Sequence, residues 1–131
     1  MPMQVELVSP ERILFSGEAD MVLCRTIDGE IAFLPDHAAF LGALDIHAMK
    51  IRLTDGTEEV AAVHGGIVEV SESRVIILSD EAELASQIDV TEVRRAKEDA
   101  ERRLMDTDDA ECEAELRRAH VRLQVAGAEP L

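Results

Sequence analysis

The sequence predicts an all-β domain, either a sandwich or a barrel, over residues 1–87 and a C-terminal αα-hairpin over residues 88–131. Three observations support this prediction. Short apolar runs rich in Val, Ile and Leu are separated by turn residues in the first region. The apolar spacing changes to the helical period after Asp89. The arginines are concentrated in the second region, which indicates that the two regions have different partners.

The first region shows the alternation of strands that bury one face. Residues 3–7 and 49–53 alternate apolar and polar side chains, whereas residues 75–78 form a run that we expect to be fully buried. Hairpin turns are expected at Asp28-Gly29 and Asp55-Gly56, because glycine readily adopts the positive φ of such turns. Further breaks between strands are expected at Ser16-Gly17, at Gly65-Gly66 and at residues 71–73.

The second region has the spacing of two helices. Asp89, with Glu92 three residues later, is a capping-box-like start, and Asp108 or Asp109 can cap the second helix. Gly127 suits its end. The apolar stripe along each helix is rich in alanine, which buries little surface. We therefore expect a hairpin that is docked loosely enough to detach. The expected stripes are Val93, Ala96, Ala100 and Leu104 on the first helix and Cys112, Leu116, Ala119 and Leu123 on the second.

The chain is strongly acidic. Its 28 acidic and 13 basic residues give a formal net charge of −15 at pH 7. Such a surface repels nucleic-acid phosphates and anionic lipid headgroups. No apolar run approaches the ~18 residues of a transmembrane helix. We therefore expect neither nucleic-acid binding nor direct membrane insertion.

The sequence contains no recognisable catalytic or metal-binding pattern. None of the four histidines lies at metal-ligand spacing from another histidine or from a cysteine. The nucleophile-elbow, P-loop and dinucleotide-binding motifs are absent. Cys24 and Cys112 lie far apart and are expected to be packed, free thiols. We expect a non-catalytic protein with no cofactor and no metal, and a small enzyme is the least favoured alternative.

Two features remain open to two interpretations each. Residues 28–42 place apolar side chains around the Pro35-Asp36-His37 corner, which is either a buried crossover with a satisfied histidine or an exposed contact patch. The arginines of the second region either form a solvated face, with pairs such as Glu98–Arg102 and Glu113–Arg117, or contact an acidic partner.

Several segments, in this order, resemble the epsilon subunit family of F-type ATP synthases, whose mitochondrial members are called delta. They are VELVSPERILFSGEA from Val5, DGEIAFLPDHAAFLGAL from Asp28, HGGIVEV from His64, ILSDEAE from Ile77 and AERRL from Ala100. The most specific phrase contains Gly29-Glu30, Leu34-Pro35 and His37. The alternative without this resemblance is a generic acidic β-sandwich adaptor with a helical tail.

The resemblance implies a non-catalytic subunit of the central stalk of a proton-translocating ATP synthase, peripheral to the cytoplasmic face of the cell membrane. Its β domain is then a ten-strand sandwich that binds the rotating gamma subunit and rests on the polar loops of the c-ring. By motif position, Glu30 corresponds to the residue that faces the c-ring. The gamma-facing positions correspond to Ser9, His37, Phe40, Leu41 and Gly42.

The resemblance also implies a role for the hairpin. In the family it folds against the sandwich or extends toward the alpha/beta catalytic head, where it inhibits ATP hydrolysis. Its basic residues then meet an acidic loop of the catalytic beta subunits. The candidates here are Arg102, Arg103, Arg117, Arg118 and Arg122.

Some family members bind ATP on the folded hairpin through an Ile/Leu-Asp-x-x-Arg-Ala motif and later arginines. Here the segment from Ile88 carries Glu92 where Arg is expected and Val93 where Ala is expected, although Arg118 and Arg122 match the later arginines. A carboxylate at a phosphate-facing position repels ATP. The sequence therefore predicts that this chain does not bind ATP.

Overall fold

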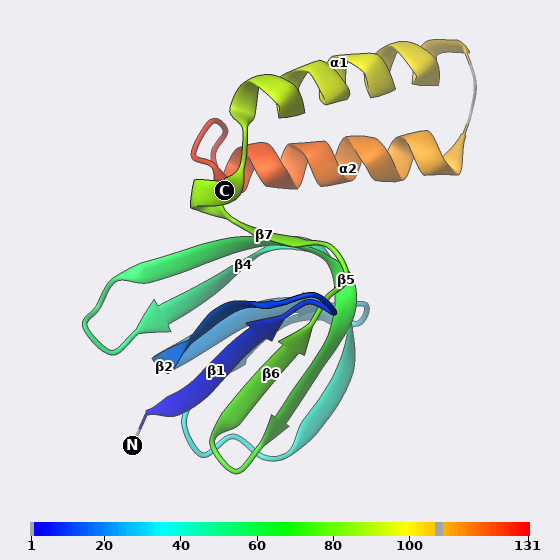
Figure 1. Cartoon of the computed structure of the whole chain (residues 1–131). Coiled ribbons are helices and arrows are strands. Elements are labelled where there is room, and N and C mark those ends of the chain that lie inside the picture. The colour runs from blue at the N-terminus through cyan, green and yellow to red at the C-terminus, as the bar shows by residue number, and fades with distance from the viewer. Residues whose placement is uncertain (1, 107–108) are drawn as a thin grey trace.

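The computed structural model describes residues 2–106 and 109–131, which form a β domain with a helix pair on one side (Figure 1). The β domain contains β1 (Met3–Val8), β2 (Ile13–Thr26), β3 (Gly29–Phe33), β4 (Phe40–Leu53), β5 (Glu58–Ser71), β6 (Arg74–Leu78) and β7 (Ala82–Leu84). A short 3-10 helix η1 (Ala85–Gln87) leads to α1 (Val90–Asp106) and α2 (Ala110–Val125).

Five of the strands close into a barrel-like sheet. They follow the order β1-β6-β5-β4-β2, and β2 pairs with β1 to complete the circle. β3 pairs with the second half of β2, and β7 pairs with β5 at residues 61–63. All neighbouring strands are antiparallel except β1 and β6, which are parallel.

The described residues form seven strands, and the expectation of ten is therefore wrong. β2, β4 and β5 each extend over 14 residues. Ser16 and Gly17 do not break β2, because both remain paired with β1. Gly65 and Gly66 lie inside β5 with φ of 90° and 122°, and these values allow the strand to bend without leaving the sheet. Figure 1 shows β5 curving from the side next to the helices to the opposite side of the domain.

The expected hairpin turns are confirmed. The chain turns at residues 27–28 between β2 and β3, and at residues 54–57 between β4 and β5. The core between the strands is mainly aliphatic, and Phe33 is its largest fully buried side chain. Cys24 is buried in this core as a free thiol, and burial raises its pKa to about 12. Such a thiol is unreactive at neutral pH.

The helix starts also follow the sequence. The Asp89 carboxylate accepts a hydrogen bond from the Glu92 amide at 3.2 Å, and Asp109 accepts one from the Glu111 amide at 2.9 Å. Asp108, the other candidate cap, lies outside the described residues. α2 ends where Gly127 adopts a φ of 82°, as expected. The apolar stripe of α1 does not include Ala96, which is exposed although the spacing predicts it to be packed.

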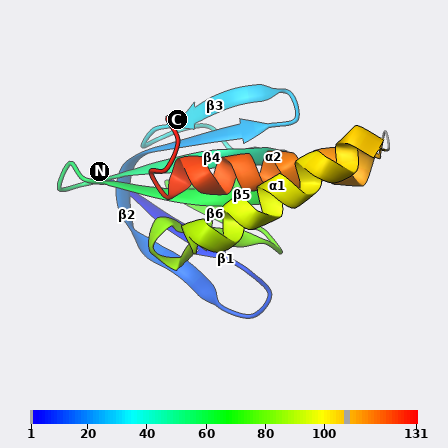
Figure 2. The same cartoon turned by 90° about the horizontal axis from the view of Figure 1, so that it is seen from above.

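The helix pair is attached to the barrel through α2. Val121 and Val125 of α2 pack on Ala62 of β5, together with apolar side chains of β4. α1 packs on α2 through Val93, which contacts Ala119 and Leu123. Figure 2, seen from above, shows both helices lying across the barrel. The docking surface is built from alanine, valine and isoleucine side chains and contains no aromatic ring among the described residues.

Candidate functional site: an exposed sheet face and an ion-paired hairpin

Three neighbouring strands present an exposed apolar surface. Leu41 of β4, Ile67 of β5 and Leu78 of β6 are 71%, 47% and 46% exposed. Ile67 pairs with Ala43 on one side and with Leu78 on the other, so the side chains lie next to one another. We call Leu41, Ala43, Ile67 and Leu78 the apolar sheet face. Exposed apolar side chains that adjoin across strands are typical of an interaction surface.

The sequence pattern does not reveal two members of this face. The prediction that residues 75–78 are fully buried is wrong for Leu78. Ile67 follows the Gly65-Gly66 bend, where the side-chain alternation is difficult to follow from sequence. A signal is nevertheless present, because residues 76–78 are all apolar, whereas an antiparallel strand with one solvated face alternates.

Ser9, a predicted gamma-contact residue, borders the apolar sheet face. It follows Val8, which pairs with Leu78, and it lines the same surface hollow as Ile67 and Leu78. Its hydroxyl donates to the Arg12 carbonyl at 3.2 Å and accepts from the Arg12 amide at 3.3 Å. The hydroxyl therefore holds the β1–β2 turn, while the residue itself lies at the edge of the face.

His37 and Phe40 form an aromatic corner at the connection between β3 and β4. The His37 ring meets Phe33 edge-on with the ring centroids 5.0 Å apart, and it lies 6.5 Å from Phe40. Its Nδ1 lies 2.7 Å from the Ala38 carbonyl oxygen. His37 therefore has a hydrogen-bond partner, which agrees with the interpretation of this loop as a buried crossover. The exposure of Leu34 and Leu41, in contrast, agrees with the interpretation as an exposed contact patch.

Gly42 permits the packing of this corner. A Cβ at Gly42 would lie 2.7 Å from the Phe40 ring, so a larger residue would displace the ring from the core. Leu41 is accordingly the exposed member of the predicted Phe40–Gly42 segment. Glu30, the predicted c-ring contact, lies on a different part of the surface, where it forms an exposed ion pair with Arg25 at 3.3 Å.

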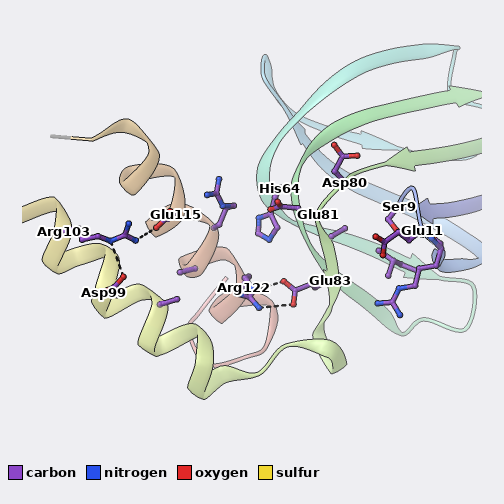
Figure 3. A pocket seen from close by; sticks show the side chains of 16 residues that line it. Ser9, Glu11, His64, Asp80, Glu81, Glu83, Asp99, Arg103, Glu115 and Arg122 are labelled. Carbon is purple, nitrogen blue, oxygen red and sulfur yellow. Dashed lines mark hydrogen bonds and ion pairs between the residues drawn. The ribbon is translucent and has the colours of Figure 1, made fainter. Parts of the chain in front are cut away.

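A cleft of about 510 Å³ is lined on one side by the helix pair and on the other by the barrel (Figure 3). Acidic side chains outnumber arginines among its lining residues, because six carboxylates face four guanidinium groups. The Arg122 Nε lies 2.8 Å from a Glu83 carboxylate oxygen, and this ion pair joins α2 to β7. Burial lowers the pKa of His64 to about 4, and the nearby charges of Arg122 and Arg118 contribute to this shift. The cleft therefore presents little positive charge to a phosphate group.

With the hairpin folded against the barrel, each of the five candidate arginines lies close to a carboxylate. Arg117 lies 3.9 Å from Asp45 of β4, and Arg122 pairs with Glu83 as described. The other three pair within the hairpin: Arg102 with Asp99 at 3.7 Å, Arg103 with Asp99 at 3.3 Å and with Glu115, and Arg118 with Glu111 at 2.9 Å.

The partners differ from the expected ones. The pairs Glu98–Arg102 and Glu113–Arg117 do not form, because Arg102 reaches Asp99 and Arg117 reaches the β domain. Sequence spacing identifies neighbours on one helix, but it does not show which helix face meets the barrel.

Within residues 2–106 and 109–131, no three His, Cys, Asp or Glu side chains are placed to hold a metal ion. No helix in the part of the chain that the structure describes is long and apolar enough to cross a bilayer.

The fold and these surfaces define a class of protein: a small β-barrel domain with an attached helical hairpin and an exposed apolar sheet face. Residues 2–85 match the family described as ATP synthase, Delta/Epsilon chain, beta-sandwich domain, and residues 86–127 match the corresponding long alpha-helix domain. The chain belongs to the ATP synthase delta/epsilon chain family.

Individual relatives support this membership. The ATP synthase epsilon chain of Moorella thermoacetica is 41% identical, with 96% of this chain and 97% of the relative covered. The epsilon chain of Symbiobacterium thermophilum is 43% identical, with 96% and 94% covered. In a solved mitochondrial ATP synthase of Euglena gracilis, one chain has the same fold, with a TM-score of 0.72 at 20% identity, covering 96% of this chain and 78% of that chain.

Proposed function

We propose that this chain is the epsilon subunit of the central stalk in a proton-translocating F-type ATP synthase. In that role it joins the gamma subunit to the c-ring and regulates ATP hydrolysis at the alpha/beta catalytic head. It is not itself an enzyme. Its working position is peripheral, on the cytoplasmic face of the cell membrane. We further propose that residues 1–87 serve the coupling role and residues 88–131 the regulatory role.

The observation that carries the coupling role is the apolar sheet face. Its members adjoin across three strands, its three large side chains are exposed, and Ser9 lies at its edge. We assign this face to gamma, together with the corner formed by His37, Phe40 and Gly42. Apolar anchors surrounded by polar residues contribute most of the binding energy in such interfaces.

Glu30 is our proposed contact with the c-ring loops. Its carboxylate is exposed and pairs with Arg25 across the β2–β3 hairpin. Exposed ion pairs contribute little free energy, so the carboxylate is available to polar groups of a partner. Its strand, β3, is also not one of the three strands that form the apolar sheet face.

Binding to a gamma-type stalk subunit tests the gamma assignment. We expect Ile67→Lys and Leu78→Lys to weaken the complex at least about tenfold, because each places a charge in the apolar centre of the interface. Isothermal titration calorimetry with the purified gamma subunit measures this change. Met105→Lys is the matched control, because Met105 is 85% exposed and lies near the end of α1.

All three variants should retain the circular dichroism spectrum of the parent chain. Wild-type affinity in both sheet-face variants would exclude this face as the gamma interface. Failure of the parent chain to bind any gamma-type subunit would count against the epsilon role as a whole.

We propose that the hairpin regulates hydrolysis through its arginines. In the folded state Arg117 and Arg122 are paired with carboxylates of the β domain. These are two of the groups that we assign to the acidic loop of the catalytic head. The folded and extended states therefore compete for the same guanidinium groups, and a switch requires two states that are close in free energy.

A further inference from the structure

The segment after α2 folds back along the helix pair. Gly127 reverses the chain with a φ of 82°, and the amide of Ala128 donates to the Leu123 carbonyl at 2.9 Å. The Gln124 side chain donates to the Pro130 carbonyl at 3.0 Å. Residues 127–131 are therefore anchored to the last turns of α2. In Figure 1 this red segment forms a small loop beside the end of α2.

One carboxylate in this segment contacts both helices. Lys97 of α1 donates from Nζ to Glu129 Oε1 at 2.9 Å, and the Nδ1 of His120 in α2 lies 2.6 Å from Glu129 Oε2. The Lys97 and Glu129 side chains are only 29% and 25% exposed, so solvent screens this pair less than a fully exposed one. The Lys97 ammonium lowers the pKa of Glu129 and so favours the ionised carboxylate.

The same segment adds apolar contact. Ala128 packs against the cluster that joins the two helices, formed by Val93 of α1 and by Ala119 and Leu123 of α2. α1 itself buries only Val93 and Ala100 among its described residues. The apolar part of its attachment to α2 therefore rests on few buried side chains, and Ala128 adds contact to it.

We propose that residues 127–131 act as a clasp that holds α1 against α2 and limits how often the hairpin opens. Separation of the two helices requires Glu129 to leave Lys97 or His120, and Ala128 to leave the joint cluster. Such a clasp is strong enough to bias a two-state hairpin but weak enough to release when a partner binds the open form. An effect of the clasp on ATP hydrolysis rests on the proposed function, whereas its effect on the separation of α1 from α2 does not.

Hydrogen–deuterium exchange of the isolated full chain tests the clasp. In Glu129→Gln we expect the amides of α1 to exchange about two- to fivefold faster, because a half-buried ion pair is lost. A chain that ends at Ala126 should show a larger increase, about tenfold, because the contacts of Ala128 are lost as well. The β strands should exchange at the parent rate in every variant.

Two further variants make the test specific. Glu98→Gln removes an exposed charge one residue from Lys97 and should leave α1 exchange unchanged. Lys97→Gln should accelerate exchange in the same direction as Glu129→Gln. The double variant should exchange no faster than Glu129→Gln alone, since that variant already lacks the carboxylate that Lys97 binds.

Parent-like exchange of α1 in both Glu129→Gln and the shortened chain would overturn the proposal. Equal acceleration in the barrel and in α1 would overturn it too, because the segment would then stabilise the whole chain and not the helix pair. Neither result bears on gamma binding, so failure of the clasp and failure of the epsilon role are distinguishable.

Discussion

At the scale of single residues, the glycines of β5 decide how the sheet closes. Gly66 has a φ of 122°, and a Cβ at this position would lie 2.1 Å from the Leu78 carbonyl oxygen. The bend therefore requires both the backbone freedom of glycine and the absence of a side chain. The sequence indicates that Gly65-Gly66 is special, but it suggests a turn between strands and not a bend within one.

We predict that Gly66→Ala lowers the free energy of unfolding by about 2–4 kcal/mol, because it combines backbone strain with a clash against β6. Gly56→Ala is the control, since its φ is 90° but no atom lies within 4 Å of the added Cβ. That variant should lose only about 1 kcal/mol from strain. Urea denaturation measures both free energies of unfolding. Equal losses would show that the backbone moves the added Cβ away from the Leu78 carbonyl oxygen at little cost in free energy.

At the scale of elements, the described residues hold the helix pair on the barrel through aliphatic side chains and through the ion pairs of Arg117 and Arg122. Val121 and Val125 contribute the apolar contact, while Arg117 and Arg122 reach Asp45 and Glu83. The Arg117–Asp45 contact is exposed and therefore individually weak, whereas the Arg122–Glu83 pair is half-buried. In the regulatory role that we propose, these contacts matter because they occupy the arginines and not because they stabilise the fold.

We predict that Asp45→Asn combined with Glu83→Gln strengthens inhibition of ATP hydrolysis in the reassembled complex by about two- to tenfold, because it releases two arginines and weakens the folded state. Arg117→Glu combined with Arg122→Glu should instead relieve inhibition. Asp55→Asn, on the exposed β4–β5 turn, is the control. Unchanged hydrolysis in both double variants would reject an inhibitory role for these arginines.

At the scale of the whole molecule, negative charge dominates the surface, and it extends into the cleft between the hairpin and the barrel. Glu83 neutralises Arg122 there, and Glu115 and Asp99 neutralise Arg103. The formal charge of the chain is −15. A nucleotide that carries several negative charges has to displace these carboxylates before it can reach a guanidinium group.

We predict that ATP at about 1 mM neither produces a saturable binding heat nor raises the melting temperature of the isolated chain, since a ligand must bind the folded state to stabilise it. Calorimetric titration checks this result. Glu83→Gln is the informative companion, because it frees Arg122: binding in this variant alone would show that the ion pair blocks the site. A clear titration of the parent chain would contradict the prediction.

Much of this protein follows from local sequence. The hairpin turns at Asp28-Gly29 and Asp55-Gly56, the caps at Asp89 and Asp109, and the helix end at Gly127 all form where the residues indicate. These features depend on the φ that glycine can adopt and on side chains that reach their own backbone. The resemblance to the epsilon family likewise depends only on short segments read in order along the chain.

The tertiary structure decided what depends on distant residues. Local pattern does not show that β2 and β5 run through their expected breaks, that Ile67 and Leu78 face solvent, or that Arg117 and Arg122 meet carboxylates of the β domain. Pairing across the sheet and the docking of α2 determine these outcomes, and both join residues that are far apart in the chain. The sequence by itself determined the hairpin turns and the helix ends, because these rest on short-range sterics and hydrogen bonds. The exposed faces were decided only when the barrel closed, because closure determined which side chains it covered.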